Sequence, residues 1–198
     1  MSDGERQIGS TVDDEAVTGR ALVVGGSGML SGCTATLVAD GWHVVTPSRR
    51  YGPIPDRDQA GARRALWVPA DWNDPEAFTE GARDALGGAA DLLVVWVHSS
   101  YRRAVLRALA TLLRSSAPVI EVHGSAAADP LTGCPEPKLP GHPTQQVVLG
   151  FVRSGGRVRW LTNAEIADGV LAAVRRALSG RPPMLHQVGE LRPWALHP

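Results

Sequence analysis

The sequence is poor in cysteine. Its 198 residues include 2 cysteines, Cys33 in a predicted helix and Cys134 in a proline-rich stretch. The two lack the spacing of metal ligands, and no pattern in the chain pairs them with each other. We therefore expect neither a metal site nor a disulfide.

Net charge is also lacking. Lys and Arg together number 20, as do Asp and Glu, so the formal net charge is zero. Such a chain has no global electrostatic field that would draw it to nucleic acid or to an anionic membrane. The expected partners are a small-molecule substrate and a second copy of the chain in a homo-oligomer, with no nucleic acid and no membrane.

Long hydrophobic runs are absent as well. No stretch reaches the roughly 18 apolar residues that a membrane-spanning helix needs, and the polar, acidic N-terminus has no apolar segment of the kind found in signal peptides. The sequence thus predicts a cytoplasmic protein. Residues 1–18 offer little surface to bury and are expected to form a flexible leader.

The chain does contain an alternation of apolar strands and amphipathic helices, with 43% hydrophobic residues, enough for one sizeable core. Strands are predicted at 21–24, 42–46, 65–68, 92–97, 118–122, 147–152 and 158–160, and helices at 29–40, 75–86, 102–113 and 162–178. This order predicts an α/β fold with a doubly wound, mostly parallel sheet and right-handed crossovers. We expect a single domain over 19–180, a long loop at 126–144, and an irregular C-terminal tail over 181–198.

A glycine cluster follows the first predicted strand, in the sequence Val23-Val24-Gly25-Gly26-Ser27-Gly28. A strand, a tight turn and a helix place unpaired N–H groups and the positive end of a helix dipole where a diphosphate can sit. The match to G-x-G-x-x-G is incomplete, because Ser31 stands at the third glycine position. An ordinary tight turn is the alternative interpretation. The predicted diphosphate-binding residues are Gly25, Gly26, Ser27, Gly28, Met29 and Leu30.

The second and third strands end in residues that suit the rest of a dinucleotide. Ser48-Arg49-Arg50 follows the second strand, where an NAD-specific site usually carries a carboxylate for the ribose 2′-hydroxyl. A guanidinium there can pair with a 2′-phosphate, so NADP is preferred over NAD, with solvated surface arginines as the alternative. Asp71-Trp72 follows the third strand, and Asp71 can accept from an adenine amino group or simply precede a helix.

Two further strands end in histidine. His98 follows the strand at 92–97, and His123 ends the next one, two residues before Ser125. Neighbouring parallel strands lie about 4.8 Å apart, which predicts one pocket that holds all three side chains. Histidine can transfer protons near neutral pH, although either ring could merely bond to backbone. Tyr101 is a further candidate acid, unless it faces solvent. Gln145 is a candidate for contact with a nicotinamide or a substrate, with plain surface polarity as the alternative.

These residues resemble a known family. Ala-Leu-Val-Val-Gly-Gly-Ser-Gly-Met-Leu, with Arg49 after strand two and Asp71 after strand three, resembles the short-chain dehydrogenase/reductase superfamily over about residues 20–125. The second half looks like a group of shortened bacterial relatives. The resemblance implies a Rossmann-like fold, a nicotinamide cofactor and Ser125 as the family serine. The Tyr-x-x-x-Lys pair of the family is missing, because neither Tyr51 nor Tyr101 precedes a lysine at that spacing.

The sequence therefore predicts an NADP-dependent oxidoreductase with an atypical active site, acting on a small carbonyl, imine or enone. Two alternatives stay open. One is a non-catalytic dinucleotide-binding module that senses the cofactor or regulates a partner. The other is a non-redox isomerase or lyase that uses the same pocket, with a histidine as base. Fold-level resemblance favours the cofactor and leaves the reaction undecided.

Overall fold

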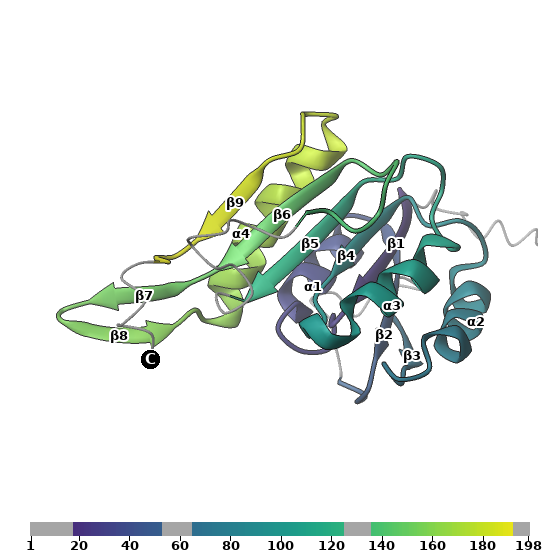
Figure 1. The fold of residues 1–198 in the computed structure, drawn as a ribbon, viewed down its shortest axis with the longest axis horizontal. Coiled ribbons are helices and arrows are strands. Elements are labelled where there is room, and N and C mark those ends of the chain that lie inside the picture. The colour runs from purple at the N-terminus through teal and green to yellow at the C-terminus, as the bar shows by residue number, and fades with distance from the viewer. Residues whose placement is uncertain (1–17, 53–64, 125–135, 192–198) are drawn as a thin grey trace, which may run out of the picture.

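Seven parallel strands form the centre of the computed structural model, which describes residues 18–52, 65–124 and 136–191 (Figure 1). Their order across the sheet is β3-β2-β1-β4-β5-β6-β9. The strands are β1 (Gly19–Val24), β2 (Trp42–Ser48), β3 (Leu66–Pro69), β4 (Leu92–Val95), β5 (Val119–Gly124), β6 (Thr144–Leu149) and β9 (Leu185–Val188). The predicted α/β fold with a doubly wound parallel sheet is confirmed.

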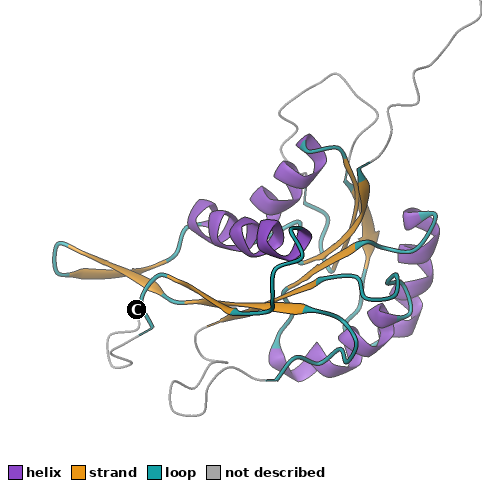
Figure 2. Ribbon diagram, turned by 90° about the horizontal axis from the view of Figure 1, so that it is seen from above, coloured by secondary structure: helices purple, strands orange, loops and turns teal. Residues whose placement is uncertain are grey.

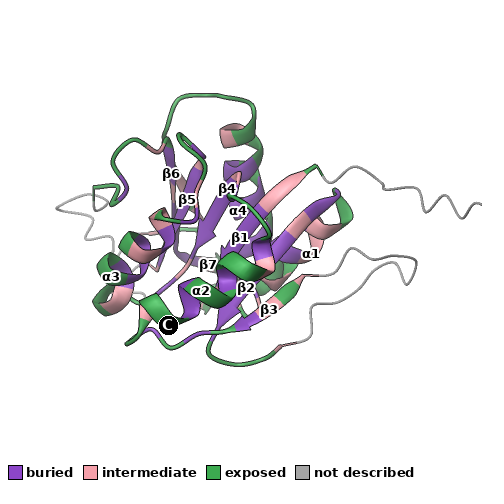
Figure 3. Cartoon of the chain, turned by 90° about the vertical axis from the view of Figure 1, so that its right-hand side faces the viewer, coloured by how far each residue is buried: buried purple, intermediate pink, exposed green. Residues whose placement is uncertain are grey.

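Helices cover both faces of this sheet (Figure 2). They are α1 (Ser31–Ala39), α2 (Pro75–Leu86), α3 (Ser99–Ala110) and α4 (Asn163–Leu178). α2 and α3 pack on one face, against alternate strand residues such as Leu22 and Leu93. α1 and α4 pack on the other face, against the intervening residues such as Val23 and Val94. The central strands are buried on both faces (Figure 3), which explains their continuous apolar runs. No helix in the described ranges is long and apolar enough to cross a membrane.

Local capping sets the ends of the helices that the sequence predicts best. The Asp74 carboxylate accepts from the Ala77 N–H at 3.2 Å to start α2, Pro75 occupies the first turn, and Gly87 ends the helix in the left-handed conformation. In α4, Thr162 and Glu165 form the predicted capping box. α3 begins three residues before its predicted start, because His98 caps it.

The α4 crossover differs in hand from the other helical crossovers. α1 carries the chain from β1 toward the β3 edge, whereas α2 and α3 carry it toward β9 on the opposite face. α4 also carries the chain toward β9, but on the face that α1 occupies. The prediction of right-handed crossovers throughout is therefore wrong for β6-α4-β9. Right-handed β-α-β crossovers are favoured when the helix follows its strand directly and packs back on the sheet. Here a ribbon is inserted between β6 and α4.

That ribbon consists of β7 (Phe151–Ser154) and β8 (Arg157–Trp160), which are antiparallel and joined at Gly155 and Gly156. Both glycines have positive φ, 57° and 76°, as a two-residue hairpin turn requires. The single strand predicted at 147–152 is wrong, because the chain leaves the main sheet at Gly150. A Cβ at this glycine would collide with the Glu190 carbonyl.

The sequence predicts an irregular tail from residue 181, but part of this segment forms a strand. Leu185–Val188 form β9, which pairs in parallel with β6 from Gln146 to Leu149. The amide of Gln145, 1% exposed, anchors this segment. Its Nε2 donates to the carbonyls of Arg181 and Pro182, and its Oε1 accepts from the Met184 N–H and from His186 Nε2. Gln145 is therefore a structural clamp, not a substrate contact.

Candidate functional site

The glycine loop has two glycines that the fold itself requires. Gly25 has a φ of 86°, and a Cβ there would lie 3.1 Å from the Trp96 carbonyl oxygen. At Gly26 a Cβ would lie 2.7 Å from Thr34 Oγ1 and 2.9 Å from a Thr46 methyl group. Both positions therefore need glycine so that β1 and α1 can join closely.

Gly28 is different, because none of the described residues requires it to lack a side chain. Its φ lies outside the left-handed region, and among the described residues the only heavy atom within 4 Å of an added Cβ is the Gly25 carbonyl oxygen, at 3.8 Å. The residue is exposed at the start of α1. A Cβ there would fill open space above the helix end, which is the space that a diphosphate occupies in a strand-turn-helix site.

The N-terminus of α1 leaves hydrogen-bond donors for a ligand. Leu30 is the N-cap but provides no side-chain bond, and the first turn has no acidic residue. Within the described ranges no acceptor takes the N–H groups of Ser27, Met29 or Leu30. The Leu30 side chain is fully buried in the core, so only its backbone can serve a ligand. Unpaired donors and the helix dipole together favour an anion at this position.

Ser27 and Ser48 support the site by joining its parts. Ser27 Oγ donates to Ser48 Oγ at 2.8 Å or to the Arg50 carbonyl at 3.2 Å. Ser48 Oγ donates to the same carbonyl at 2.7 Å and accepts from Trp67 Nε1 at 2.9 Å. Both hydroxyl protons are thus used within the protein. The pair ties the glycine loop to the end of β2 and to β3, and so fixes the backbone that presents Arg49 and Arg50.

A pocket opens where β2 and β3 end. It is lined by Arg49, Trp67, Pro69, Ala70, Asp71, Asp74, Ala77 and Phe78. The side chains of Arg49 and Arg50 are exposed, and within the described ranges neither has a hydrogen bond or ion pair. Asp71 Oδ1 accepts from the Asn73 N–H at 2.9 Å, which leaves Oδ2 for a ligand.

Trp72 does not belong to this pocket. Its indole is 7% exposed and stands edge-on to Phe78, with ring centroids 5.4 Å apart. The turn after β3 directs the indole into the core beneath α2, so the predicted role of Trp72 in cofactor binding is left to its backbone.

His98 is exposed at the C-terminal edge of the sheet. Its Nδ1 accepts from the Ser100 N–H at 3.4 Å and lies 2.7 Å from Ser100 Oγ. Because a backbone N–H can only donate, Nδ1 is the acceptor, and the proton of the neutral ring is on Nε2. His98 therefore presents an N–H donor to the solvent at the edge where ligands bind in this topology.

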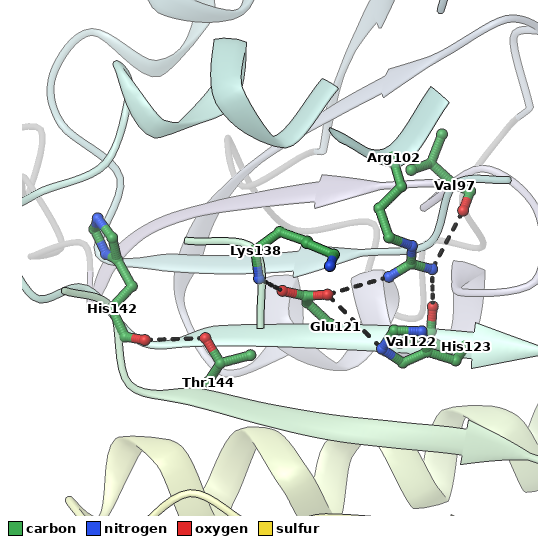
Figure 4. Close-up of polar contacts among 8 residues, drawn as sticks. All are labelled: Val97, Arg102, Glu121, Val122, His123, Lys138, His142 and Thr144. Carbon is green, nitrogen blue, oxygen red and sulfur yellow. Dashed lines mark hydrogen bonds and ion pairs between the residues drawn. The ribbon is translucent and has the colours of Figure 1, made fainter. Parts of the chain in front are cut away.

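His123 is in a different environment. Its side chain is 1% exposed, and neither ring nitrogen has a hydrogen-bond partner among the described residues. Nε2 lies 3.7 Å from Glu121 Oε2 (Figure 4). Burial, with the charges of Arg102 and Lys138, lowers the pKa of His123 from 6.5 to about 4. The ring is therefore neutral at pH 7, and the prediction that it opens with His98 into one solvent-accessible pocket is wrong, because on β5 it faces inward toward α3.

Arg102 is the residue that the sequence analysis missed. Its Nη2 donates to the carbonyls of Val97 at 3.3 Å and Val122 at 2.7 Å, and Nη1 lies 3.4 Å from Glu121 Oε2. Val95 and Glu121 are the last residues at which β4 and β5 pair with each other. The guanidinium joins the two chain segments beyond that point, by its bonds to the carbonyls of Val97 and Val122 (Figure 4). The available signal was a glutamate inside an apolar strand, which needs a buried cationic partner.

The remaining predicted residues are placed as follows. Tyr101 lies in the first turn of α3 and is partly buried against the core beneath α2 and α3. Ser125 lies outside the described residues. The described part of the connection from β5 to β6, residues 136–143, is irregular and is anchored where the Lys138 N–H donates to Glu121 Oε1 at 3.0 Å.

The titration of His123 gives a testable dependence of stability on pH. Between pH 6.5 and 4 the unfolded chain binds a proton that the folded chain excludes, so the free energy of unfolding should fall as the pH drops through this window. The loss attributable to this residue is on the order of 3 kcal/mol. Urea unfolding at several pH values should show a shallower decline for His123→Leu than for the parent protein. Parallel curves for the two proteins would refute this assignment.

Comparison with solved structures finds the same fold in several proteins. A short-chain dehydrogenase/reductase from Serratia marcescens has 14% identity and a TM-score of 0.59, with 87% of this chain and 98% of that chain covered. BdcA, solved in complex with NADPH, has 14% identity and a TM-score of 0.57, with coverages of 87% and 93%. UDP-glucose 4-epimerase from Brucella ovis, solved in complex with NAD, has 13% identity and a TM-score of 0.60, with coverages of 88% and 78%.

No family model and no curated protein matches the sequence. At these low identities the likeness to solved structures concerns the fold. The chain has the Rossmann-like fold of short-chain dehydrogenase/reductases, and the fold that the resemblance implied is thereby confirmed. The likeness extends well beyond residues 20–125, the part of the sequence in which the resemblance was recognised.

Proposed function

We propose that this chain is a dinucleotide-dependent oxidoreductase that prefers NADP(H) and reduces a small carbonyl, imine or enone. The observation that carries the proposal is the open space at Gly28. The fold requires glycine at two other positions of the loop but not here, whereas a diphosphate above the start of α1 needs this space. Unpaired N–H groups at the same helix end supply the donors.

Preference for NADP(H) rests on Arg49. Its exposed guanidinium lines the pocket at the ends of β2 and β3, and no carboxylate follows β2 to receive a ribose 2′-hydroxyl. An arginine fork suits a 2′-phosphate. Among the fold neighbours one is a complex with NADPH and another a complex with NAD, so the preference for NADP(H) rests on this chain's own residues.

In the proposed reaction a bound nicotinamide supplies the hydride. The protein's part is to hold the substrate oxygen or nitrogen and give it a proton. His98 is the candidate for this step, because its Nε2–H points to solvent at the ligand-binding edge of the sheet. Ser100 fixes the tautomer and the ring orientation by its two contacts to Nδ1. Ser125 stays a candidate hydroxyl donor from the sequence.

A titration with NADPH and with NADH, followed by calorimetry, tests the binding proposal. We expect the parent protein to bind NADPH more tightly than NADH. Arg49→Glu should lower the affinity for NADPH by about 10-fold or more, since a bidentate charged contact contributes ~1.5–3 kcal/mol, and should change the affinity for NADH little. Arg107→Glu, a charge reversal on the exposed side of α3, is the control and should leave both affinities unchanged. Absence of binding by either nucleotide would overturn the proposal.

A screen of small carbonyl compounds with NADPH then tests the reaction. For any substrate found, His98→Gln should lower turnover by roughly 10²–10⁴-fold, the usual contribution of a general acid, while the affinity for NADPH is retained. Unchanged turnover in His98→Gln would remove the assigned role of this residue.

A non-catalytic cofactor-binding module is the second candidate function. It is favoured by the absence from the sequence of a tyrosine followed four residues later by lysine, since the single lysine is Lys138. Tight NADPH binding without oxidation of NADPH by any compound of the screen would support this candidate over the first.

A further inference from the structure

Arg102 holds the backbone on both sides of His98. Its Nη2 donates at 3.3 Å to the Val97 carbonyl, which belongs to the peptide group before His98. Its own backbone N–H donates at 3.1 Å to the His98 carbonyl, which belongs to the peptide group after it. The two backbone torsion angles of His98, a φ of −56° and a ψ of 144°, are therefore each restrained by a bond from the same residue.

The guanidinium of Arg102 is itself fixed to the neighbouring strand. The same Nη2 donates to the Val122 carbonyl of β5 at 2.7 Å, and Nη1 lies 3.4 Å from Glu121 Oε2 (Figure 4). Glu121 is 0% exposed, and its other carboxylate oxygen accepts from the Lys138 N–H at 3.0 Å. Arg102 thus sets where the peptide group before His98 lies relative to the end of β5.

A gain in stability does not explain why the buried side chain at this position is an arginine. Apolar side chains of similar volume are often as stabilising as a buried ion pair. A guanidinium differs from them in having a planar, rigid fork that holds several acceptors in a fixed arrangement. One of these acceptors is the Val97 carbonyl, directly before His98, which is exposed at the edge of the sheet where ligands bind. The fork is therefore suited to holding His98 in place.

We propose that Arg102 is a positioning residue for proton transfer by His98, with the buried carboxylate of Glu121 as its anchor. The proposal rests on the proposed function, in which His98 Nε2–H gives a proton to the substrate. Ser100 orients the imidazole ring, and Arg102 places the backbone that carries it. A displacement of about 1 Å at a reacting group can cost on the order of 100-fold in rate. Arg102 should therefore affect turnover and not the binding of the dinucleotide.

The double variant Arg102→Met, Glu121→Leu separates positioning from stability. It removes both buried charges together, so the fold should be retained, but the Val97 carbonyl loses its guanidinium. With a substrate from the screen, we expect kcat to fall by about 10–100-fold and the KM for NADPH to stay unchanged. The solvent deuterium isotope effect on kcat should rise, because proton transfer then becomes the slow step. Arg103→Met, at the adjacent exposed position of α3, is the matched control and should leave all three values unchanged.

Arg102→Lys is a second variant, which keeps a positive charge for Glu121 but replaces the fork with a single nitrogen. We expect this ammonium to stay with the carboxylate and to release the Val97 carbonyl, so kcat should fall and the isotope effect should rise as in the double variant. Circular dichroism confirms that each variant is folded. Parent-like kcat and isotope effect in either folded variant would overturn the proposal.

NMR relaxation of the backbone N–H groups of His98 and Ser99 tests the positioning without a substrate. Both variants should have lower order parameters at these two amides than the parent protein and Arg103→Met. Unchanged order parameters in the folded variants would overturn the positioning role, even in a protein whose reaction depends on His98. Lower order parameters in a protein that reduces no compound of the screen would support the positioning role and contradict the proposed reaction, so the two failures are distinguishable.

Discussion

Gly28→Asp is expected to abolish NADPH binding, with a loss of at least about 100-fold, and to leave the fold intact. The position accepts a side chain sterically, because its φ is ordinary and the nearest heavy atom to an added Cβ is 3.8 Å away. Gly28 precedes the N-cap Leu30 by two residues, where a carboxylate does not oppose the dipole of α1. The same carboxylate would occupy the diphosphate position and repel its charge, which makes the effect on binding large.

Calorimetric titration and urea unfolding of the same samples measure the two effects separately. Gly28→Ala isolates the steric part and should give an intermediate affinity. Gly26→Ala is the opposite control, because its methyl group would press on Thr34 and Thr46, so it should lower the free energy of unfolding. If Gly28→Asp bound NADPH as tightly as the parent protein, the loop would be no more than a structural turn.

Arg102→Met is expected to lower the free energy of unfolding by roughly 3–5 kcal/mol, the usual cost of leaving one member of a buried ion pair without its partner. Glu121 is 0% exposed, and the substitution would remove the guanidinium from its carboxylate, which would keep the hydrogen bond from the Lys138 N–H. The carbonyls of Val97 and Val122 would also lose a donor. The ends of β4 and β5 should then separate more easily.

The double variant Arg102→Met, Glu121→Leu distinguishes lost charge pairing from lost packing. It should recover much of the stability, because apolar side chains of similar size can replace a buried ion pair. Arg103→Met, at the adjacent exposed position, should change the free energy of unfolding by no more than about 0.5 kcal/mol. An Arg102→Met variant as stable as the parent protein would mean that the guanidinium does not hold the two strands together.

The sequence predicts those elements whose ends are set by neighbouring residues. α2 has its predicted limits because Asp74, Pro75 and Gly87 are all local signals. β9 could not be recognised in this way. Its place depends on Gln145, which is about 40 residues earlier in the chain, and its four residues show no apolar pattern of their own.

The candidate site likewise contains features that neighbouring residues determine and features that depend on distant residues. The glycine loop is visible in the sequence because its residues are contiguous, and the structure adds which of its glycines the fold requires. His123 and Trp72 were placed by their position after a strand, but that position does not determine which side of the sheet a side chain enters. Arg102 lies on the buried face of α3 with Val105 and Leu109, and a one-dimensional pattern cannot show that Glu121 lies opposite it.

The clamp at Gln145 also bears on the order in which a newly made chain completes its fold. β9 is the last strand of the described chain to leave the ribosome, some 40 residues after the glutamine that anchors it. Until then β6 is an open edge, and the buried amide lacks its four partners. A nascent chain is therefore most exposed to mispairing during this interval. When β9 pairs with β6, it covers that edge and completes the seven-stranded sheet.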